Sequence, residues 1–245
     1  MFADLFNPET LQEAWEIICT EFPLALWETF YVTVLATAFA IIIGLPLGIL
    51  VVVGEKGGVL PIPRWILSVV NFIINVMRSI PFLILMILVF PLTRALIGTT
   101  IGTVASIVPL VIAAFPFVAR LVEGCLREVN PNIIEMAQST GASPLQIICK
   151  VMLPESVPSL ISNFTVAITT ILGYSAMSGI IGGGGLGKIA INYGYYRYKY
   201  LVMFLAVIVL VILVQVFQTV GTRLAVNTDK RLKNQAGRRH RDQAE

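Results

Sequence analysis

Histidine and cysteine are too scarce in this sequence for the common catalytic and metal-binding arrangements. Among 245 residues there is one histidine, His240, in a polar C-terminal stretch, which argues against histidine triads, histidine zinc sites and haem ligation. Cys19, Cys125 and Cys149 are an odd number without CxxC spacing, so we expect neither a disulfide framework nor a metal cluster. The sequence therefore offers no catalytic residues, no metal site and no cofactor of its own.

Charged residues are also few. They make up 13% of the chain, against about 25% in a typical soluble domain, and hydrophobic residues make up 57%, against roughly 45–50%. With a mean hydropathy of +0.86, the chain has too little polar surface to cover its apolar residues as a soluble protein would. These proportions exclude an ordinary water-soluble enzyme and predict an all-α integral membrane protein.

Long stretches without Asp, Glu, Lys or Arg mark the membrane-spanning segments. A helix that spans a bilayer needs about 20 mostly apolar residues, and four uncharged stretches exceed that length: 29–54, 95–119, 156–187 and 200–222. A fifth apolar stretch, 65–93, is interrupted only by Arg78. We therefore expect five transmembrane helices, near 25–53, 65–92, 101–124, 157–180 and 200–222.

The first 23 residues are acidic and differ from a signal peptide. They carry five acids and no Lys or Arg, whereas a signal peptide begins with a positive region before a short apolar core. Asn-Pro-Glu at 7–9 is typical of a helix start, with Asn as the N-cap and Pro in the first turn. Leu11, Trp15 and Ile18 share one face of that helix, so we expect a short amphipathic helix at the membrane surface.

The distribution of basic residues sets the orientation. With five spans and the C-terminus inside, eleven Lys and Arg lie in the inner segments and four in the outer ones, as the positive-inside rule requires. The N-terminus then lies outside and the C-terminus in the cytoplasm. We divide the chain into an external N-terminal segment (1–23), a transmembrane domain (24–224) and a basic cytoplasmic tail (225–245).

The basic tail has two interpretations. Its Lys and Arg residues are compatible with nucleic-acid binding, and equally with a segment that faces anionic lipid directly after the last span. We favour the second, because the tail follows a membrane span and no soluble domain adjoins it.

A glycine string imitates nucleotide-binding loops but lacks their context. Residues 182–188 satisfy both G-x-x-x-x-G-K and G-x-G-x-x-G. Ile189 follows Lys188, so the hydroxyl that binds magnesium is missing, and a membrane helix rather than a strand precedes the glycines. They also fall on the predicted outer side. We interpret the string as a flexible, close-packed turn and expect any ATP hydrolysis on another subunit.

The inner loop at 127–155 carries two helix signals around a glycine. Asn-Pro at 130–131 predicts one helix start, and Gly141 suits its C-terminal cap, where a left-handed conformation is needed. A Ser-x-x-Gln capping box at 143–146 predicts the start of a second helix. Two short helices on a glycine elbow make a rigid knob (residues 131–153) that can transmit motion to another protein.

The same loop carries a longer motif. Glu-Met-Ala at 135–137, Gly141 and Val-Met-Leu-Pro at 151–154 match E-A-A, three residues, G, nine residues, I-x-L-P, with Met and Val as conservative departures. This pattern resembles the cytoplasmic motif of ABC importer permeases, and we expect Pro154 to end the second helix. The resemblance implies that an ATPase subunit docks on the knob through Glu135, Ala137, Gly141, Ala142, Ser143, Val151, Leu153 and Pro154.

Further runs narrow the resemblance. Arg-Ser-Ile-Pro-Phe at 78–82, Gly-Tyr-Ser-Ala-Met-Ser-Gly at 173–179, Gly-Gly-Leu-Gly at 184–187 and Tyr-Gly-Tyr at 193–195 resemble the methionine-uptake permeases. The resemblance covers roughly residues 25–225 and implies a type I ABC importer permease. It further implies a homodimer of five-span subunits in the bacterial inner membrane, two cytoplasmic ATPase subunits, and an extracytoplasmic lipoprotein that delivers methionine. Such a permease moves its substrate by alternating access and performs no chemistry.

Polar residues of the fourth span share one helical face. Asn163, Thr170, Tyr174 and Ser178 recur at spacings of 7, 4 and 4, and a polar stripe should avoid lipid. The stripe either lines the translocation pathway or makes hydrogen bonds between helices. Together with the family runs it gives the candidate pathway residues Arg78, Ser79, Pro81, Asn163, Thr170, Tyr174, Ser175, Met177 and Ser178.

Arg78 has two interpretations that the sequence leaves open. If 65–92 is one span, the arginine lies at membrane depth, where a charge costs at least about 2.5–3.5 kcal/mol and must face protein or water. If the helix bends at Pro81, the long side chain reaches a surface.

Two pairs of residues predict contacts within the helical bundle. Gly44 and Gly48 form a G-x-x-x-G pair that favours close helix packing, more often within a chain than between chains. Arg120 and Glu123 are expected to pair at the inner end of the third span.

Two other function classes compete with an ABC permease. A secondary transporter needs coupling carboxylates inside the membrane or an internal inverted repeat, and an intramembrane enzyme needs a histidine at membrane level or paired acids. We find none of these in the sequence. The substrate stays open to another small polar solute, because related permeases with the same loop carry other amino acids, betaines or anions.

Overall fold

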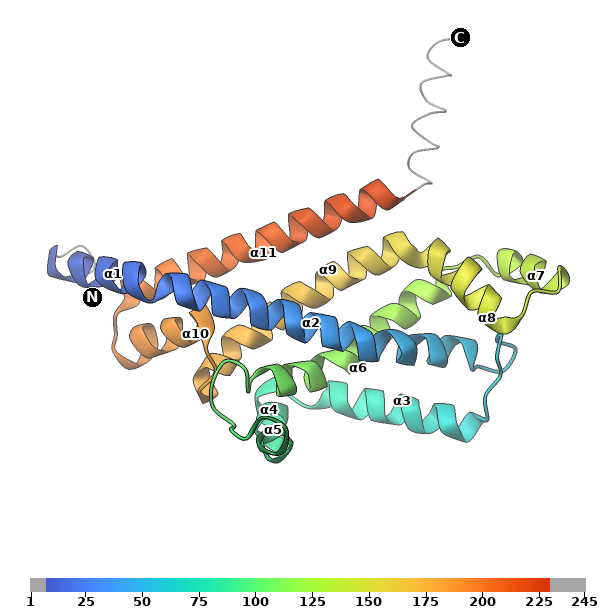
Figure 1. The fold of residues 1–245 in the computed structure, drawn as a ribbon, viewed down its shortest axis with the longest axis horizontal. Coiled ribbons are helices and arrows are strands. Elements are labelled where there is room, and N and C mark those ends of the chain that lie inside the picture. The colour runs from blue at the N-terminus through green and yellow to red at the C-terminus, as the bar shows by residue number, and fades with distance from the viewer. Residues whose placement is uncertain (1–7, 230–245) are drawn as a thin grey trace, which may run out of the picture.

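The computed structural model describes residues 8–229, and within them every regular element is helical. Long helices run along the long axis of the molecule, and short helices lie at both ends (Figure 1). Three stretches depart from α-helix: η2 and η4 are π-helical, and η3 is a 3-10 turn. The elements in chain order are α1 (Pro8–Thr20), α2 (Phe22–Val53), α3 (Arg64–Ser79), α4 (Phe82–Leu88), α5 (Phe90–Ile97), α6 (Ile107–Arg127), α7 (Pro131–Ser139), α8 (Pro144–Ile147), η2 (Ile148–Met152), α9 (Leu153–Ser178), η3 (Gly179–Ile181), α10 (Gly185–Ile189), η4 (Ala190–Tyr196) and α11 (Tyr200–Thr228).

Four helical segments of the described chain are long and apolar enough to cross a membrane: Phe22–Val53, Ile107–Arg127, Pro144–Ile181 and Tyr200–Thr228. The fifth candidate is a bent pair, because α3 and α4 meet the same criteria only together and are bent by 111°. The prediction of an all-α membrane protein is confirmed, and the predicted number of spans is reached if the broken pair makes one crossing.

The apolar stretch predicted near 65–92 as the second span is not one continuous helix. α3 ends at Ser79, and Ile80 is extended, with ψ 127°, because the ring of Pro81 disfavours helical backbone in the residue before it. The 16 residues of α3 rise only about 24 Å, at about 1.5 Å per residue, which is less than the ~30 Å hydrocarbon core. The bend at Pro81 agrees with the interpretation in which the helix bends there and the Arg78 side chain reaches a surface.

The third span starts at Ile107, later than the predicted residue 101. Gly98 and Gly102 have φ of +85° and +112°, which interrupts helix before that point. The N–H of Gly102 donates to the carbonyl oxygen of Gly182 at 2.9 Å, so this loop is held against the glycine string.

Pro154 does not end the second helix of the knob, contrary to the prediction. The helical run continues from Pro144 to Ile181. In the π-turn η2, the N–H of Leu153 donates to the carbonyl oxygen of Ile148, five residues back. Pro154 directly follows this π-turn, where the changed backbone hydrogen bonding accommodates a residue without an N–H inside a continuous helical run. The second helix of the knob and the fourth span therefore form one helical rod, and α7 is joined to it through the elbow at Gly141.

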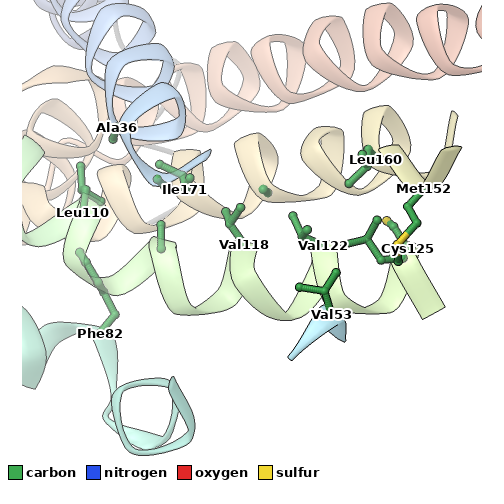
Figure 2. Packing of buried hydrophobic residues seen from close by; sticks show 14 of the residues in the cluster. Ala36, Val53, Phe82, Leu110, Val118, Val122, Cys125, Met152, Leu160 and Ile171 are labelled. Atoms are coloured by element: carbon green, nitrogen blue, oxygen red, sulfur yellow. The ribbon is translucent and has the colours of Figure 1, made fainter. Parts of the chain in front are cut away.

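α6 lies at the centre of the main hydrophobic core. Its residues Leu110, Ala114, Val118 and Val122 recur every four positions and are fully buried. α2 and α9 both pack against α6. Figure 2 shows Leu110, Val118 and Val122 in a row along α6, with Phe82 of α4 at one end.

Two glycines bring α2 against the backbone of α6. An added Cβ would lie 2.8 Å from the carbonyl oxygen of Phe115 at Gly44, and 2.6 Å from that of Ala119 at Gly48. The G-x-x-x-G pair thus serves packing within the chain, as predicted.

The two ends of the bundle carry different elements. α7 and α8 lie at one end, together with the end of α11, and α1 and α10 lie at the other (Figure 1). The predicted N-terminal helix is present as α1. It packs against α2 and α11, with Ala14 and Ile17 in a buried cluster that also holds residues of α10, and it leaves Leu11 and Trp15 44% and 68% exposed. Its position at a membrane surface stays a prediction.

The chain ends are described only in part. Asn7, the predicted N-cap, lies outside the described residues, as does the basic segment 230–245. α11 runs to Thr228, so the first residues assigned to the tail, 225–228, continue the last helix.

Replacing Gly48 with valine should destabilise the bundle. The new side chain would collide with the backbone at Ala119 and with Val122, and such overpacking typically costs about 1–3 kcal/mol. We expect a lower melting temperature in detergent. Gly124→Ala in α6 is the control, because among the described residues no atom beyond its chain neighbours and the backbone of its own helix lies within 4 Å of its added Cβ. Equal melting temperatures for Gly48→Val and wild type would contradict the packing role.

Candidate functional site

The knob forms at one end of the bundle from α7 and α8 (Figure 1). α7 begins at the predicted pair: the Asn130 side chain accepts the N–H of Asn132 at 3.0 Å, and Pro131 lies in the first turn. The start of the knob is thus fixed by its own sequence.

Gly141 forms the elbow between the two helices. Its φ is +79°, the left-handed conformation predicted for this position. The N–H of Gly141 donates to the carbonyl oxygen of Gln138 at 3.0 Å, and that of Ala142 to the carbonyl oxygen of Ala137 at 3.1 Å. These two bonds make a Schellman motif. Ala137 and Ala142 both pack against the main core, which accounts for their small size in this motif.

α8 begins with the predicted capping box. The N–H of Ser143 donates to Gln146 Oε1 at 2.9 Å, and the N–H of Gln146 donates to Ser143 Oγ at 3.4 Å. Ile147 at the end of α8, and Ile148 and Met152 in η2, are buried in the main core. These three side chains fix the knob to the bundle, so the knob cannot turn freely on its connections.

The knob presents apolar side chains on its surface. Met136 and Leu145 are 64% and 70% exposed. Large apolar side chains exposed on rigid helices are typical of surfaces that bind another protein. Of the predicted coupling residues, those exposed are Glu135, Gly141, Ser143 and Pro154, and those half-buried are Ala137, Ala142, Val151 and Leu153.

Charged side chains join several elements at the root of the knob. Arg127, the last residue of α6, donates to Glu55 at 2.5 and 3.1 Å and to Glu123 at 2.9 and 3.1 Å. The hydrogen bonds from Arg127 lower the pKa of the Glu55 carboxyl and favour its ionised form. Sequence analysis missed this contact, which joins residues 72 positions apart.

The predicted pair of Arg120 and Glu123 is present. Arg120 also donates to the side-chain oxygens of Asn71 at 2.8 Å and Asn75 at 2.9 Å, both on α3. Arg120 of this pair therefore also holds α3 against α6.

Tyr174 of α9 joins two of the candidate pathway segments. Its ring stacks on Phe82, with centroids 4.7 Å apart and planes 7° apart. Since Phe82 follows Pro81, the run at 78–82 meets the run at 173–179. Arg78 is exposed in the last turn of α3, just before the bend.

The other polar residues of the stripe make hydrogen bonds inside the chain. Asn163 donates to the thiol of Cys125 on α6 at 3.0 Å, while Thr170 and Ser178 donate to carbonyl oxygens of their own helical run at 2.8 and 2.7 Å. Asn163 thus fits the helix-packing interpretation, and a role in the pathway stays a prediction. The candidate pathway residues that are exposed are Arg78, Ser79, Pro81 and Met177, and those buried or half-buried are Asn163, Thr170, Tyr174, Ser175 and Ser178.

The glycine string is close-packed, as interpreted. Gly182 and Gly185 have φ of +88° and +79°. An added Cβ at Gly184 would lie 2.6 Å from Glu28 Oε2, and one at Gly187 would lie 2.2 Å from the carbonyl oxygen of Ala176. Side-chain and backbone atoms of the same chain therefore approach these glycines closely, as in a packed turn.

Glu28 of α2 is a second residue that sequence analysis missed. One carboxylate oxygen accepts the hydroxyl of Thr103 at 2.9 Å, and the other accepts the N–H of Gly185 at 2.7 Å. Glu28 therefore ties α2 to the loop before α6 and to the start of α10. The sequence does show an acid at the edge of an uncharged span, which could have marked Glu28 as a residue with a partner. It does not show that partner, because Gly185 lies 157 positions away.

Comparison with known proteins places this architecture in a family. The family described as "Binding-protein-dependent transport system inner membrane component" matches residues 40–234. The chain is 45% identical over 210 residues to the probable D-methionine transport system permease protein MetI of Vibrio cholerae, covering 84% of this chain and 92% of that protein. It is also 45% identical over 217 residues to the protein of the same name from Pasteurella multocida, covering 89% and 98%.

A solved structure is similar to the chain in fold as well as in sequence. A chain in the structure of inward-facing conformations of the MetNI methionine ABC transporter has a TM-score of 0.85 and 40% sequence identity, covering 88% of this chain and 99% of that chain. The present chain therefore belongs to the methionine-transport permeases, inner-membrane components of binding-protein-dependent ABC importers.

Proposed function

We propose that this chain is the membrane-spanning permease of an ATP-driven methionine importer. The knob is the observation that carries the proposal: it is capped at both helix starts, fixed to the core by Ile147 and Met152, and exposes Met136 and Leu145. Relatives 45% identical to the chain are methionine transport permeases. ATP hydrolysis belongs to a separate subunit, and the permease takes part by docking that subunit on its knob.

The working complex contains two copies of the chain, two cytoplasmic ATPase subunits and one extracytoplasmic substrate-binding lipoprotein. Each knob docks on one ATPase subunit through its exposed face. The family description, which names a binding-protein-dependent system, supports the lipoprotein as the source of substrate. In this scheme the permease needs only loose substrate contacts, because the binding protein supplies most of the selection.

Alternating access follows from motion of the knobs. When ATP draws the two ATPase subunits together, the knobs approach each other and the bundle opens outward to accept methionine. Hydrolysis returns it to the inward-facing form. The continuous run from Pro144 to Ile181 supports this scheme, because a single rod carries displacement from the knob to the far end of α9.

The knob end lies in the cytoplasm and the α1 end lies outside. The excess of Lys and Arg in the segments at the knob end supports this orientation. α1, which carries Glu13 and Glu16, lies at the opposite end from α7 (Figure 1). The protein is thus a multi-pass protein of the bacterial inner membrane with its N-terminus outside.

The substrate passes the outer half of α9. Met177 is 46% exposed there, and Tyr174 is half-buried against Phe82. A polarisable thioether side chain and an aromatic ring form an adaptable apolar wall for the thioether of methionine. Ser175 and Ser178 are 4% and 1% exposed, so their contribution depends on a rearrangement of α9.

Reporter fusions test the orientation. An enzyme active only outside should work when fused before residue 20, and one active only inside should work after residue 225. The positive-inside distribution requires both results. The inverse pattern would place the knob outside and remove the ATPase as its partner.

Replacing Gly141 with valine should weaken ATPase docking or separate hydrolysis from transport. Valine disfavours φ of +79°, at a cost of order 1 kcal/mol or more, and the elbow would change its angle. Gly98→Val is the matched control. Gly98 has φ of +85°, and at both glycines the space around an added Cβ is open to 4 Å among the described residues, apart from the chain neighbours. Gly141→Asn should retain activity, because asparagine tolerates this conformation.

The measurements are co-purification with the ATPase and substrate-stimulated hydrolysis. Normal docking and transport in a well-inserted Gly141→Val protein would rule out the elbow as a coupling element. An equal loss in Gly98→Val would assign the effect to general strain.

A reconstituted complex with its own binding protein should import radiolabelled methionine, in the L or D form, only when ATP is supplied. Unlabelled methionine should compete, and histidine, glutamine and glycine betaine should not. Import of one of these in place of methionine would contradict the substrate and leave the permease class intact. Import without ATP would instead support a secondary transporter.

A further inference from the structure

We propose that Glu55 is a positioning residue for energy coupling. By holding the guanidinium of Arg127, it fixes the root of the knob to the loop between α2 and α3. The inference rests on the proposed function, since it assumes that the knob receives motion from an ATPase subunit.

Arg127 stands where the bundle passes into the knob. It ends α6, and Asn130 caps α7 three residues later. Its two terminal nitrogens donate to the two carboxylate oxygens of Glu55 at 2.5 and 3.1 Å, the paired arrangement that gives Arg–carboxylate contacts their directionality. Glu123 accepts two further bonds from the same guanidinium. A planar group held by two carboxylates keeps one orientation, so the end of α6 is fixed.

Glu55 is a firm anchor because its own loop is closed by backbone hydrogen bonds. The N–H of Gly58 donates to the carbonyl oxygen of Glu55 at 2.9 Å, and the N–H of Leu60 donates to that of Val53 at 3.0 Å. An added Cβ at Gly58 would lie 2.5 Å from the carbonyl oxygen of Val53. The loop is therefore a compact turn, and its carboxylate has a defined position.

The other side of the root is held to α9. Glu128, next to Arg127, accepts the hydroxyl of Ser159 at 2.8 Å. Val129 is buried, with 4% exposed. The root thus lies between two fixed elements, and loss of the contact with Glu55 would leave it held on the side of α9 alone.

The contact also extends toward the candidate pathway. Glu123 binds Arg120, which donates to Asn71 and Asn75 on α3. α3 ends at Ser79, at the bend that precedes Pro81. A displacement of the root therefore reaches α3 as well as α9.

The pair of Arg127 and Glu55 is suited to positioning rather than to folding stability. Its side chains are 45% and 46% exposed, and exposed ion pairs contribute little to stability. Removing the carboxylate should therefore leave the protein folded and inserted, while the direction of the knob changes.

The test uses the whole complex in proteoliposomes, with its ATPase subunits and its binding protein. Radiolabelled methionine imported is measured per ATP hydrolysed. We expect Glu55→Gln to lower this ratio at least threefold, with ATPase co-purification unchanged. Lys56→Gln is the matched control, because Lys56 is an exposed neighbour in the same loop, and it should keep the wild-type ratio.

A double-mutant cycle asks whether Glu55 acts through Arg127. Arg127→Gln should lower the ratio at least as much as Glu55→Gln, and the double variant should match Arg127→Gln alone. Arg127→Lys keeps the charge but loses the paired geometry, so its ratio should lie between wild type and Arg127→Gln. This variant also tests the inference if Glu55→Gln gives too little protein.

The outcomes separate this inference from the proposed function. A Glu55→Gln complex with the wild-type ratio, or additive losses in the double variant, overturns the positioning role and leaves the permease assignment intact. A wild-type complex that neither binds an ATPase nor imports methionine counts against the proposed function itself.

Discussion

The backbone contact between α2 and α6 is the constraint on which the rest of the bundle depends. In a bilayer, helices gain little from excluding water, so their association depends on close packing. Gly44 and Gly48 let α2 approach the backbone of α6, and α6 then becomes the central helix on which α9 also packs. Because α6 ends at Arg127, this one contact also decides where the knob begins and which elements can reach its root.

The features that the sequence predicted correctly are those that depend on neighbours along the chain. The Asn130 cap, the Schellman turn at Gly141 and the capping box at Ser143 each use hydrogen bonds between residues no more than five positions apart. Side-chain type at one position is enough to favour such a turn. The same holds for the spans, whose length and lack of charge are properties of single stretches.

The features that the sequence left open or predicted wrongly depend on partners far along the chain or on the backbone around two prolines: the bend at Pro81 was one of two interpretations, and the helix end at Pro154 was wrong. Glu28 and Arg127 find their partners only after the helices have packed. The helix breaks at Pro81, and the residue before it is extended. The helix continues through Pro154, where a π-turn directly precedes the proline. Residue type alone does not distinguish the two cases, since the difference lies in the backbone hydrogen bonding just before each proline.

The continuity through Pro154 changes how force can pass along the molecule. A helix that ended there would give the knob a hinge, and motion of an ATPase would be lost in bending it. Instead, Ile148 and Met152 of the π-turn are buried in the core, so the stretch where the helical hydrogen bonding changes is itself packed against the bundle. At the far end, Glu28 and the glycine string hold α10 against α2. A rod that is packed against the bundle at both ends moves as one helix when it is displaced. The contacts at the two ends of the rod, rather than bending within it, then set which other elements move with it.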